Sequence, residues 1–251
     1  MSKNKTAVIT GAGTGIGKAS AATLVKNGWN VAFLGRRQNL LDVAIAELEE
    51  YADQCLALSC DVANMDNVDE TFDRVAATYG RIDLLFNNAG LGLSPKTVDE
   101  YSLDDWNNLI NVNLSGSFYC ARAAFRHMRQ QSPQGGRIIN NGSISAHTPR
   151  PKSAAYTTAK HGITGLTKTI ALDGRPFDIA CGQIDIGNAL TEIAMPMTKG
   201  TMQANGEIAV EPTIDPQQVA DAIFHMASLP LDTNILNMTI MATKMPFVGR
   251  G

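Results

Sequence analysis

Short apolar runs alternate with longer amphipathic runs along almost the whole chain. Several apolar runs are nearly continuous, as is typical of strands that are covered on both faces. This alternation predicts an α/β fold in which a doubly wound parallel sheet of about seven strands carries helices on both faces. The expected strands are 6–10, 30–34, 54–59, 82–87, 137–143, 178–184 and 236–241, and the expected helices are 16–27, 38–51, 67–79, 104–130, 153–173 and 217–228.

One region, 185–215, breaks the alternation because it is rich in Gly, Pro, Met and Thr and has weak periodicity. Long segments of this kind are usually functional. We expect a substrate loop or lid here, and an ordinary surface excursion is the alternative. Its side chains Met195, Pro196, Met197 and Met202 suggest an adaptable apolar wall. With no repeat or linker elsewhere, residues 1–251 are expected to form a single domain.

Charge and cysteine usage exclude several classes of protein. The formal net charge is −3 and no basic run occurs, so we expect no nucleic-acid or membrane partner. No signal-peptide core and no stretch approaching ~18 apolar residues is present, so no transmembrane helix is expected. The four cysteines show neither C-x-x-C pairing nor metal-site spacing. We therefore expect free thiols, no bound metal and a cytoplasmic protein.

A glycine-rich turn directly follows the first expected strand and opens the first helix. Its glycines, Gly11, Gly15 and Gly17, fit a G-x-x-x-G-x-G pattern. Glycine lets the backbone approach a pyrophosphate group closely. The negative charge of that group is then stabilised at the N-terminus of the helix. The turn, including Thr14 and Ile16, is therefore predicted to bind a dinucleotide, although a turn of this kind can also be a simple connection between elements.

The end of the second expected strand indicates which dinucleotide binds. An acidic residue at this place holds the ribose 2′-hydroxyl of NAD, whereas arginine accommodates the 2′-phosphate of NADP. This chain has Gly35 followed by Arg36 and Arg37. Guanidinium groups bind phosphate through charge-assisted hydrogen bonds. We therefore predict NADP(H) rather than NAD(H), and two solvated arginines are the alternative.

Tyr156 and Lys160 stand four residues apart in an expected helix, and Ser143 precedes them by thirteen residues. Side chains at that spacing share one helix face. A positive charge beside a phenol favours the phenolate, so we expect Lys160 to lower the pKa of Tyr156. The pair predicts a group that exchanges a proton with a substrate oxygen.

These motifs, with Asp61-Val62, Asn88-Ala89-Gly90 and Asn113, occur in one order on the expected elements. Together they resemble the short-chain dehydrogenase/reductase family from about residue 5 to 191. The resemblance implies a Rossmann-like fold, a nicotinamide cofactor and hydride exchange with a small carbonyl or alcohol substrate. It also implies assembly as a homodimer or homotetramer.

The resemblance also implies a role for each matching residue. Ser143 would hydrogen-bond the substrate oxygen, Tyr156 would act as general acid/base, and Lys160 would hold the nicotinamide ribose and lower the pKa of the tyrosine. Asn113 would anchor a water that continues the proton relay. The implied cofactor contacts are Gly11, Thr14, Gly15, Ile16, Gly17, Arg36, Arg37, Asp61, Val62, Asn88, Ala89, Gly90, Tyr156, Lys160, Gly187 and Thr191.

The chain departs from the family pattern around the expected substrate site. Ile186-Gly187 replaces Pro-Gly, which leaves the geometry of the nicotinamide loop open. Asp185 is either a substrate contact or a solvated strand end, and His147 is a candidate for the substrate loop. Gly142 stands where the family more often carries a second serine. Two functional alternatives stay open: a non-catalytic NADPH-binding regulatory module, and an epimerase or dehydratase that retains its cofactor.

Overall fold

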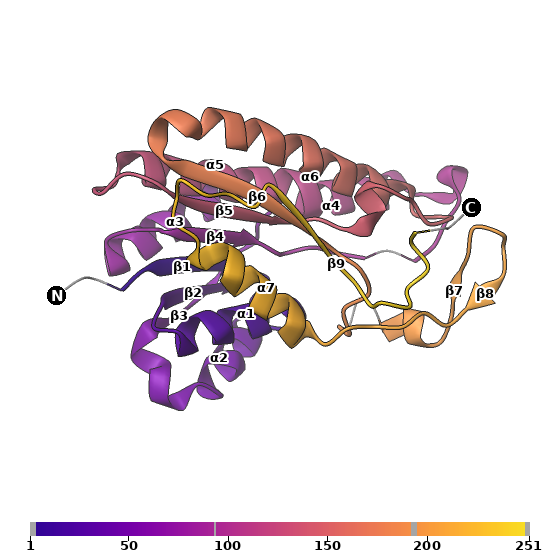
Figure 1. Ribbon diagram of the computed structural model, residues 1–251, viewed down its shortest axis with the longest axis horizontal. Coiled ribbons are helices and arrows are strands. Elements are labelled where there is room, and N and C mark those ends of the chain that lie inside the picture. The colour runs from indigo at the N-terminus through magenta and orange to yellow at the C-terminus, as the bar shows by residue number, and fades with distance from the viewer. Residues whose placement is uncertain (1–3, 93, 192–194, 249–251) are drawn as a thin grey trace.

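The apolar runs pair into one parallel sheet whose strand order is β3-β2-β1-β4-β5-β6-β9 (Figure 1). The computed structural model describes residues 4–92, 94–191 and 195–248. The chain reverses its winding direction between β1 and β4, which brings the carboxyl ends of these strands together at a crevice. The strands are β1 Thr6–Thr10, β2 Asn30–Gly35, β3 Cys55–Ser59, β4 Leu84–Asn87, β5 Gly136–Asn141, β6 Ile179–Ile186 and β9 Asn237–Ile240.

Helices cover both faces of this sheet, so the prediction of a doubly wound α/β fold is confirmed (Figure 1). Alternate residues of β1 point to opposite faces. Ile9 packs in one apolar core with α1 and α7, and Val8 packs in a second core with α3 and α5. The helices are α1 Gly15–Lys26, α2 Gln38–Ala46, α3 Met65–Tyr79, α4 Leu103–Ile110, α5 Gly116–Gln130, α6 Ala154–Asp173 and α7 Pro216–Ser228.

The helix expected over 104–130 is interrupted. A π-helical segment, Asn111–Ser115, separates α4 from α5. Such segments insert a residue into the helical turn and occur often at functional sites. Here the interruption contains Asn113, whose side chain is buried against the β4–α4 loop. The helix expected over 38–51 also ends early, at Ala46, and a 3-10 turn follows at Glu49–Gln54.

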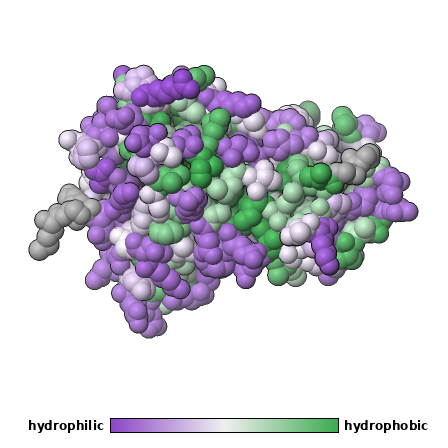
Figure 2. All heavy atoms as spheres, in the orientation of Figure 1, coloured by the Kyte–Doolittle hydropathy of each residue, from purple (hydrophilic) through white to green (hydrophobic). Residues whose placement is uncertain are grey.

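The irregular region begins later than expected, because β6 continues through Asp185 to Ile186. Beyond β6 it contains a 3-10 turn, Met195–Thr198, and a small antiparallel pair, β7 Thr201–Met202 with β8 Ile208–Ala209. Residues 192–194 and the side chains of Pro196 and Met197 lie outside the described part. Figure 2 shows hydrophobic residues gathering toward the end of the molecule that carries this pair, where Ile208 is exposed. Among the described helices, none is long and apolar enough to cross a membrane.

Candidate active site

The turn after β1 needs glycine for its shape. Gly11 and Gly15 have φ values of +67° and +53°, in the left-handed region that side chains disfavour. A Cβ on Gly17 would lie 2.2 Å from the carbonyl oxygen of Gly11. Thr14, the N-cap of α1, makes no side-chain capping bond, so the first backbone N–H groups of the helix keep their capacity to bind an anion.

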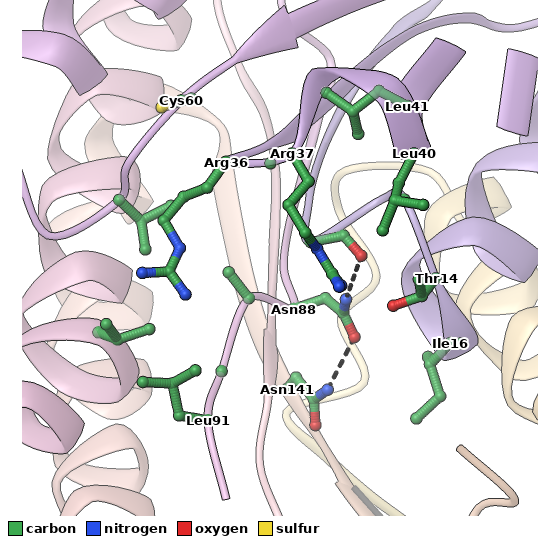
Figure 3. A pocket seen from close by; sticks show the side chains of 18 of the residues that line it. Thr14, Ile16, Arg36, Arg37, Leu40, Leu41, Cys60, Asn88, Leu91 and Asn141 are labelled. Carbon is green, nitrogen blue, oxygen red and sulfur yellow. Dashed lines mark hydrogen bonds between the residues drawn. The ribbon is translucent and has the colours of Figure 1, made fainter. Parts of the chain in front are cut away.

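Asn88 fastens this turn to the neighbouring strands (Figure 3). Its Nδ2 donates to the carbonyl oxygen of Thr10 at 2.9 Å, and its Oδ1 accepts a 3.0 Å bond from Nδ2 of Asn141. The hydroxyl of Thr10 accepts from the backbone N–H groups of Asn88 and Ala89. The carboxyl ends of β1, β4 and β5 are therefore held together beneath one cavity.

That cavity has a volume of about 340 Å³ and collects most of the expected cofactor contacts. Gly17 lies outside its lining, behind the turn, and Tyr156, Lys160 and Gly187 line a neighbouring cavity instead. The expected contacts that line it are Gly11, Thr14, Gly15, Ile16, Arg36, Arg37, Asp61, Val62, Asn88, Ala89, Gly90 and Thr191.

Arg36 and Arg37 extend from the end of β2 into this cavity (Figure 3). Both side chains are exposed, and neither forms an ion pair with any residue that the structure describes. A glycine turn at a helix N-terminus and two guanidinium groups together suit a ligand that carries several phosphates. The residues present therefore fit a nicotinamide dinucleotide.

A second cavity of about 250 Å³ contains the expected catalytic side chains Ser143, Tyr156 and Lys160. It is contiguous with the first cavity, because Ile16 and Asn141 line both. Its outer wall includes Tyr101, Met202 and other residues of the flanking loops. A ligand of the first cavity can thus reach these side chains directly.

Lys160 is buried beneath the second cavity, with 7% of its surface exposed. Its Nζ donates a 2.7 Å hydrogen bond to the carbonyl oxygen of Asn141 and lies 5.6 Å from the centroid of the Tyr156 ring. Burial lowers the pKa of Lys160 to about 8, although the charge of Asp185 acts in the opposite direction.

The pKa of Tyr156 is shifted upward in this structure, opposite to the direction expected from its neighbour Lys160. Burial raises the pKa of the phenol, and the Ser143 hydroxyl and the Arg150 charge only partly offset that effect. The ammonium group of Lys160 is buried and bonded to the Asn141 carbonyl, and it is not among the groups that shift the pKa of the phenol. Tyr156 is therefore held in its protonated form at neutral pH.

Asn113 clamps the β4–α4 loop through its side chain. Its Oδ1 accepts from the backbone N–H of Leu91 at 2.7 Å, and its Nδ2 donates to the Leu91 carbonyl at 2.9 Å. The carbonyl oxygen of Asn113 accepts a bond from the Ser117 hydroxyl. Both polar atoms of the side chain are thus used in holding the loop that lines both cavities.

The segment after β6 packs tightly against its surroundings. A Cβ on Gly187 would lie 2.6 Å from Cβ of Met241, so only glycine fits there. Ile186 stands opposite Ile240 of β9, where a proline would lack the N–H that a strand interior uses. Thr191 lies over Gly15, with its Cγ2 3.0 Å from the position of a Cβ there. Ile186 therefore extends the strand and keeps Gly187 at the cavity.

A network of polar residues beside the second cavity is not predicted from the sequence. Arg150 forms an ion pair with Glu211, which is 2% exposed and also accepts from Asn188 and Gln203. The network joins the loop before α6 to the segment after β8. No spacing pattern links Arg150 to Glu211 in the sequence, so only the fold reveals this pair.

Comparison with known proteins identifies a family that matches most of the chain. The family "short chain dehydrogenase" matches residues 5–201. A 3beta-hydroxysteroid dehydrogenase of Mediterraneibacter gnavus is 37% identical over 72% of this chain, and the chain spans only 64% of that relative. An uncharacterized oxidoreductase of Staphylococcus aureus is 34% identical over 94% of this chain and 96% of the relative.

Solved structures show the same fold. A 3-ketoacyl-(acyl-carrier-protein) reductase of Brucella melitensis, complexed with NADH, superposes with a TM-score of 0.85 at 23% identity, covering 96% of this chain and 98% of the other. Other structures of similar fold are complexes with NADP+ or NADPH. The chain therefore belongs to the short-chain dehydrogenase family of oxidoreductases, which use a nicotinamide cofactor.

Proposed function

We propose that the protein is an NADP(H)-dependent oxidoreductase that moves a hydride between the nicotinamide and the carbonyl/alcohol pair of a small molecule. One observation carries the proposal: Ser143, Tyr156 and Lys160 line a cavity that is contiguous with the cavity of the glycine turn. A dinucleotide bound at the glycine turn would thus extend into the second cavity, where its nicotinamide end would lie beside a proton donor.

The chain's own residues explain how the cofactor would be held. The bound nicotinamide supplies or accepts the hydride, which is chemistry that no side chain here can perform. The backbone of the Gly11–Gly17 turn would receive the pyrophosphate at the N-terminus of α1. Arg36 and Arg37 would bind the 2′-phosphate, because both lack an ion-pair partner among the described residues and line this cavity. Lys160 and Gly187 would border the nicotinamide end.

The protonated state of Tyr156 suits reduction of a carbonyl. When hydride reaches the carbonyl carbon, negative charge develops on the oxygen, and a positioned acid contributes roughly 10²–10⁴-fold to the rate. The raised pKa of Tyr156 keeps its proton available for this transfer. Ser143 would donate a hydrogen bond to the same oxygen, since its hydroxyl accepts from Ser145 and retains its own proton for donation.

We also propose that the region after β6 forms the outer wall of the substrate site, because Thr201 and Met202 line the second cavity. The fold is proposed to work in the cytoplasm as a homodimer or homotetramer. Exposed apolar side chains on the long helices, Phe118 of α5 and Leu172 of α6, are consistent with such an assembly.

The proposal is tested by following NADPH depletion with a panel of acyl, sugar-derived and alicyclic ketones. We expect net oxidation of NADPH with at least one ketone and formation of the matching alcohol. Binding of NADPH with no net turnover of any carbonyl, or of any alcohol with NADP+, would contradict it and would favour a regulatory module. Conversion of the substrate without net change in NADPH would favour an epimerase or dehydratase.

A further inference from the structure

Asp185 is a fully buried carboxylate directly behind Ser143. It lies on β6 with none of its surface exposed, and it does not line the second cavity. The sequence leaves two roles open for Asp185, a substrate contact and a solvated strand end. A fully buried side chain outside the cavity fits neither role. Burying a charge is costly unless the charge is paired and hydrogen-bonded, so its surroundings must compensate it.

Hydrogen-bond donors surround both carboxylate oxygens. Oδ1 accepts from the backbone N–H of Ser143 at 2.9 Å and from Nε2 of Gln183 at 2.6 Å. Oδ2 accepts from Nε2 of His147 at 2.7 Å and from Nδ2 of Asn237 at 2.8 Å. The carboxylate thus ties the turn that carries Ser143 to β6 and β9. Loss of this contact would release the backbone from which the side chain of Ser143 extends.

Gly142 leaves room for this carboxylate. A Cβ at position 142 would lie 2.0 Å from Oδ1 of Asp185, far inside van der Waals contact. The φ of Gly142 is outside the left-handed region, so its backbone alone does not require glycine. The space taken by Asp185, and by Gln183 beside it, is the reason why this position carries no side chain.

Asp185 also acts on Lys160. Its negative charge raises the pKa of the lysine against the lowering effect of burial. Among the described residues, Tyr156 faces the ammonium group as well, and His147 contacts the outer oxygen of Asp185. The side chain of His147 is 43% exposed, so the pair connects the buried carboxylate to solvent.

We propose that Asp185 is a positioning residue for this active site: its carboxylate fixes the backbone of Ser143, two residues from the Asn141 carbonyl to which Lys160 is bonded. The inference rests on the proposed oxidoreductase function, because it assigns Ser143 and Lys160 their roles. Asp185 itself touches neither substrate nor cofactor. Its effect on the reaction therefore passes through these two residues.

The first test needs no substrate. The titration midpoint of Lys160 is followed by NMR of 13C-labelled lysine in the nucleotide-free protein, with Lys160→Arg used to assign the signal. We expect Asp185→Asn to move the midpoint to lower pH, because an opposite charge is lost. Asp83→Asn is the matched control, since Asp83 is a largely buried, hydrogen-bonded carboxylate at the opposite end of the sheet. An unchanged midpoint in Asp185→Asn would overturn the electrostatic part.

The second test uses NADPH oxidation with the ketone on which the wild type is fastest. We expect Asp185→Asn to lower kcat roughly 10- to 100-fold, in the range of one lost charged hydrogen bond, with the Kd for NADPH within about twofold. Asp83→Asn should keep kcat. Gly142→Ala retains the negative charge of Asp185 but displaces the carboxylate. It should therefore lower kcat, and it should move the titration midpoint of Lys160 by less than Asp185→Asn moves it.

These results separate the inference from the proposed function. Wild-type kcat in both Gly142→Ala and Asp185→Asn, with Tyr156→Phe inactive, would overturn the positioning role alone. Full activity of Tyr156→Phe would instead overturn the proposed function. If Asp185→Asn fails to fold, Gly142→Ala with wild-type kcat still contradicts the inference, and a reduced kcat supports it.

Discussion

The ammonium group of Lys160 is bonded to the carbonyl oxygen of Asn141, the last residue of β5, across 2.7 Å. This bond joins α6 to the end of the strand from which the Ser143 turn departs. It holds a positive charge under the cavity and away from the solvent. Burial of this charge explains why the pKa of Lys160 is lowered to about 8.

Lys160 is expected to make stability depend on pH in the alkaline range. Its pKa is about 8 in the folded protein against 10.5 for an ordinary lysine. Below about pH 8 both states carry the proton, so the full penalty for burying the charge is present. Between pH 8 and pH 10.5 the unfolded chain binds more protons than the folded protein. The free energy of unfolding therefore rises with pH, by on the order of 2–3 kcal/mol over this range.

Urea unfolding of the nucleotide-free protein checks this from pH 7 to 10.5. The free energy of unfolding of the wild type, measured relative to Lys160→Met, should rise across that range. A difference that stays constant with pH would show that Lys160 titrates at its ordinary value.

Glu211 is expected to anchor the segment after β8 to the active-site wall. Removing one partner of a buried ion pair costs about 3–5 kcal/mol, so Glu211→Gln should lower the free energy of unfolding by that amount. Glu207→Gln is the matched control, because Glu207 is exposed in the turn between β7 and β8 and should change stability by less than about 0.5 kcal/mol. Equal effects of the two substitutions would refute the anchoring role.

The same ion pair sets a dependence on acid pH. Burial alone would raise the pKa of Glu211, but hydrogen bonds from Arg150, Gln203 and Asn188 lower it to about 2. The stabilisation is therefore fully present above about pH 4.5 and is lost as pH falls toward 2. Acid unfolding of wild type and Glu211→Gln should converge in this window, and a parallel course of the two curves would contradict the assignment.

The two arginines after β2 are expected to select the cofactor. Arg36→Asp places a carboxylate where a 2′-phosphate would bind, so the ratio of NADPH to NADH affinity should fall roughly tenfold or more. Arg74→Asp, an exposed arginine on α3, makes the same charge change away from the cavity and should leave the ratio unchanged. Fluorescence titration with both nucleotides measures it, and an unaltered ratio in Arg36→Asp would remove this residue from phosphate recognition.

The sheet and its helices could be predicted from sequence because their signals are local. The apolar strand runs and the helical periodicity are repeated every few residues, and Gly80 ends α3 in the left-handed conformation expected of a C-cap glycine. The interruption at Asn111–Ser115 could not be predicted in this way. The interruption contains Asn113, which bonds to Leu91 of the β4–α4 loop, and the helical pattern of the sequence shows no break at this place.

The site shows the same division. The glycine turn and the Tyr156–Lys160 spacing are motifs within one element, and the structure places them around contiguous cavities. The contacts of Asp185 with Ser143, and of Glu211 with Arg150, join residues 42 and 61 positions apart. No periodicity in the sequence connects such pairs, so their contacts are seen only in the folded structure. The raised pKa of Tyr156 likewise results from burial, which the sequence motif does not reveal.

Replacement of Tyr156 by phenylalanine tests the central claim most directly. The substitution removes only the hydroxyl, so the ring should keep its packing against Leu109 and Ala159. NADPH oxidation with the best ketone of the panel is measured beside NADPH binding by fluorescence. The account predicts a rate reduced by roughly 10²-fold or more, with the Kd for NADPH within about threefold of wild type. A rate near that of the wild type would contradict it.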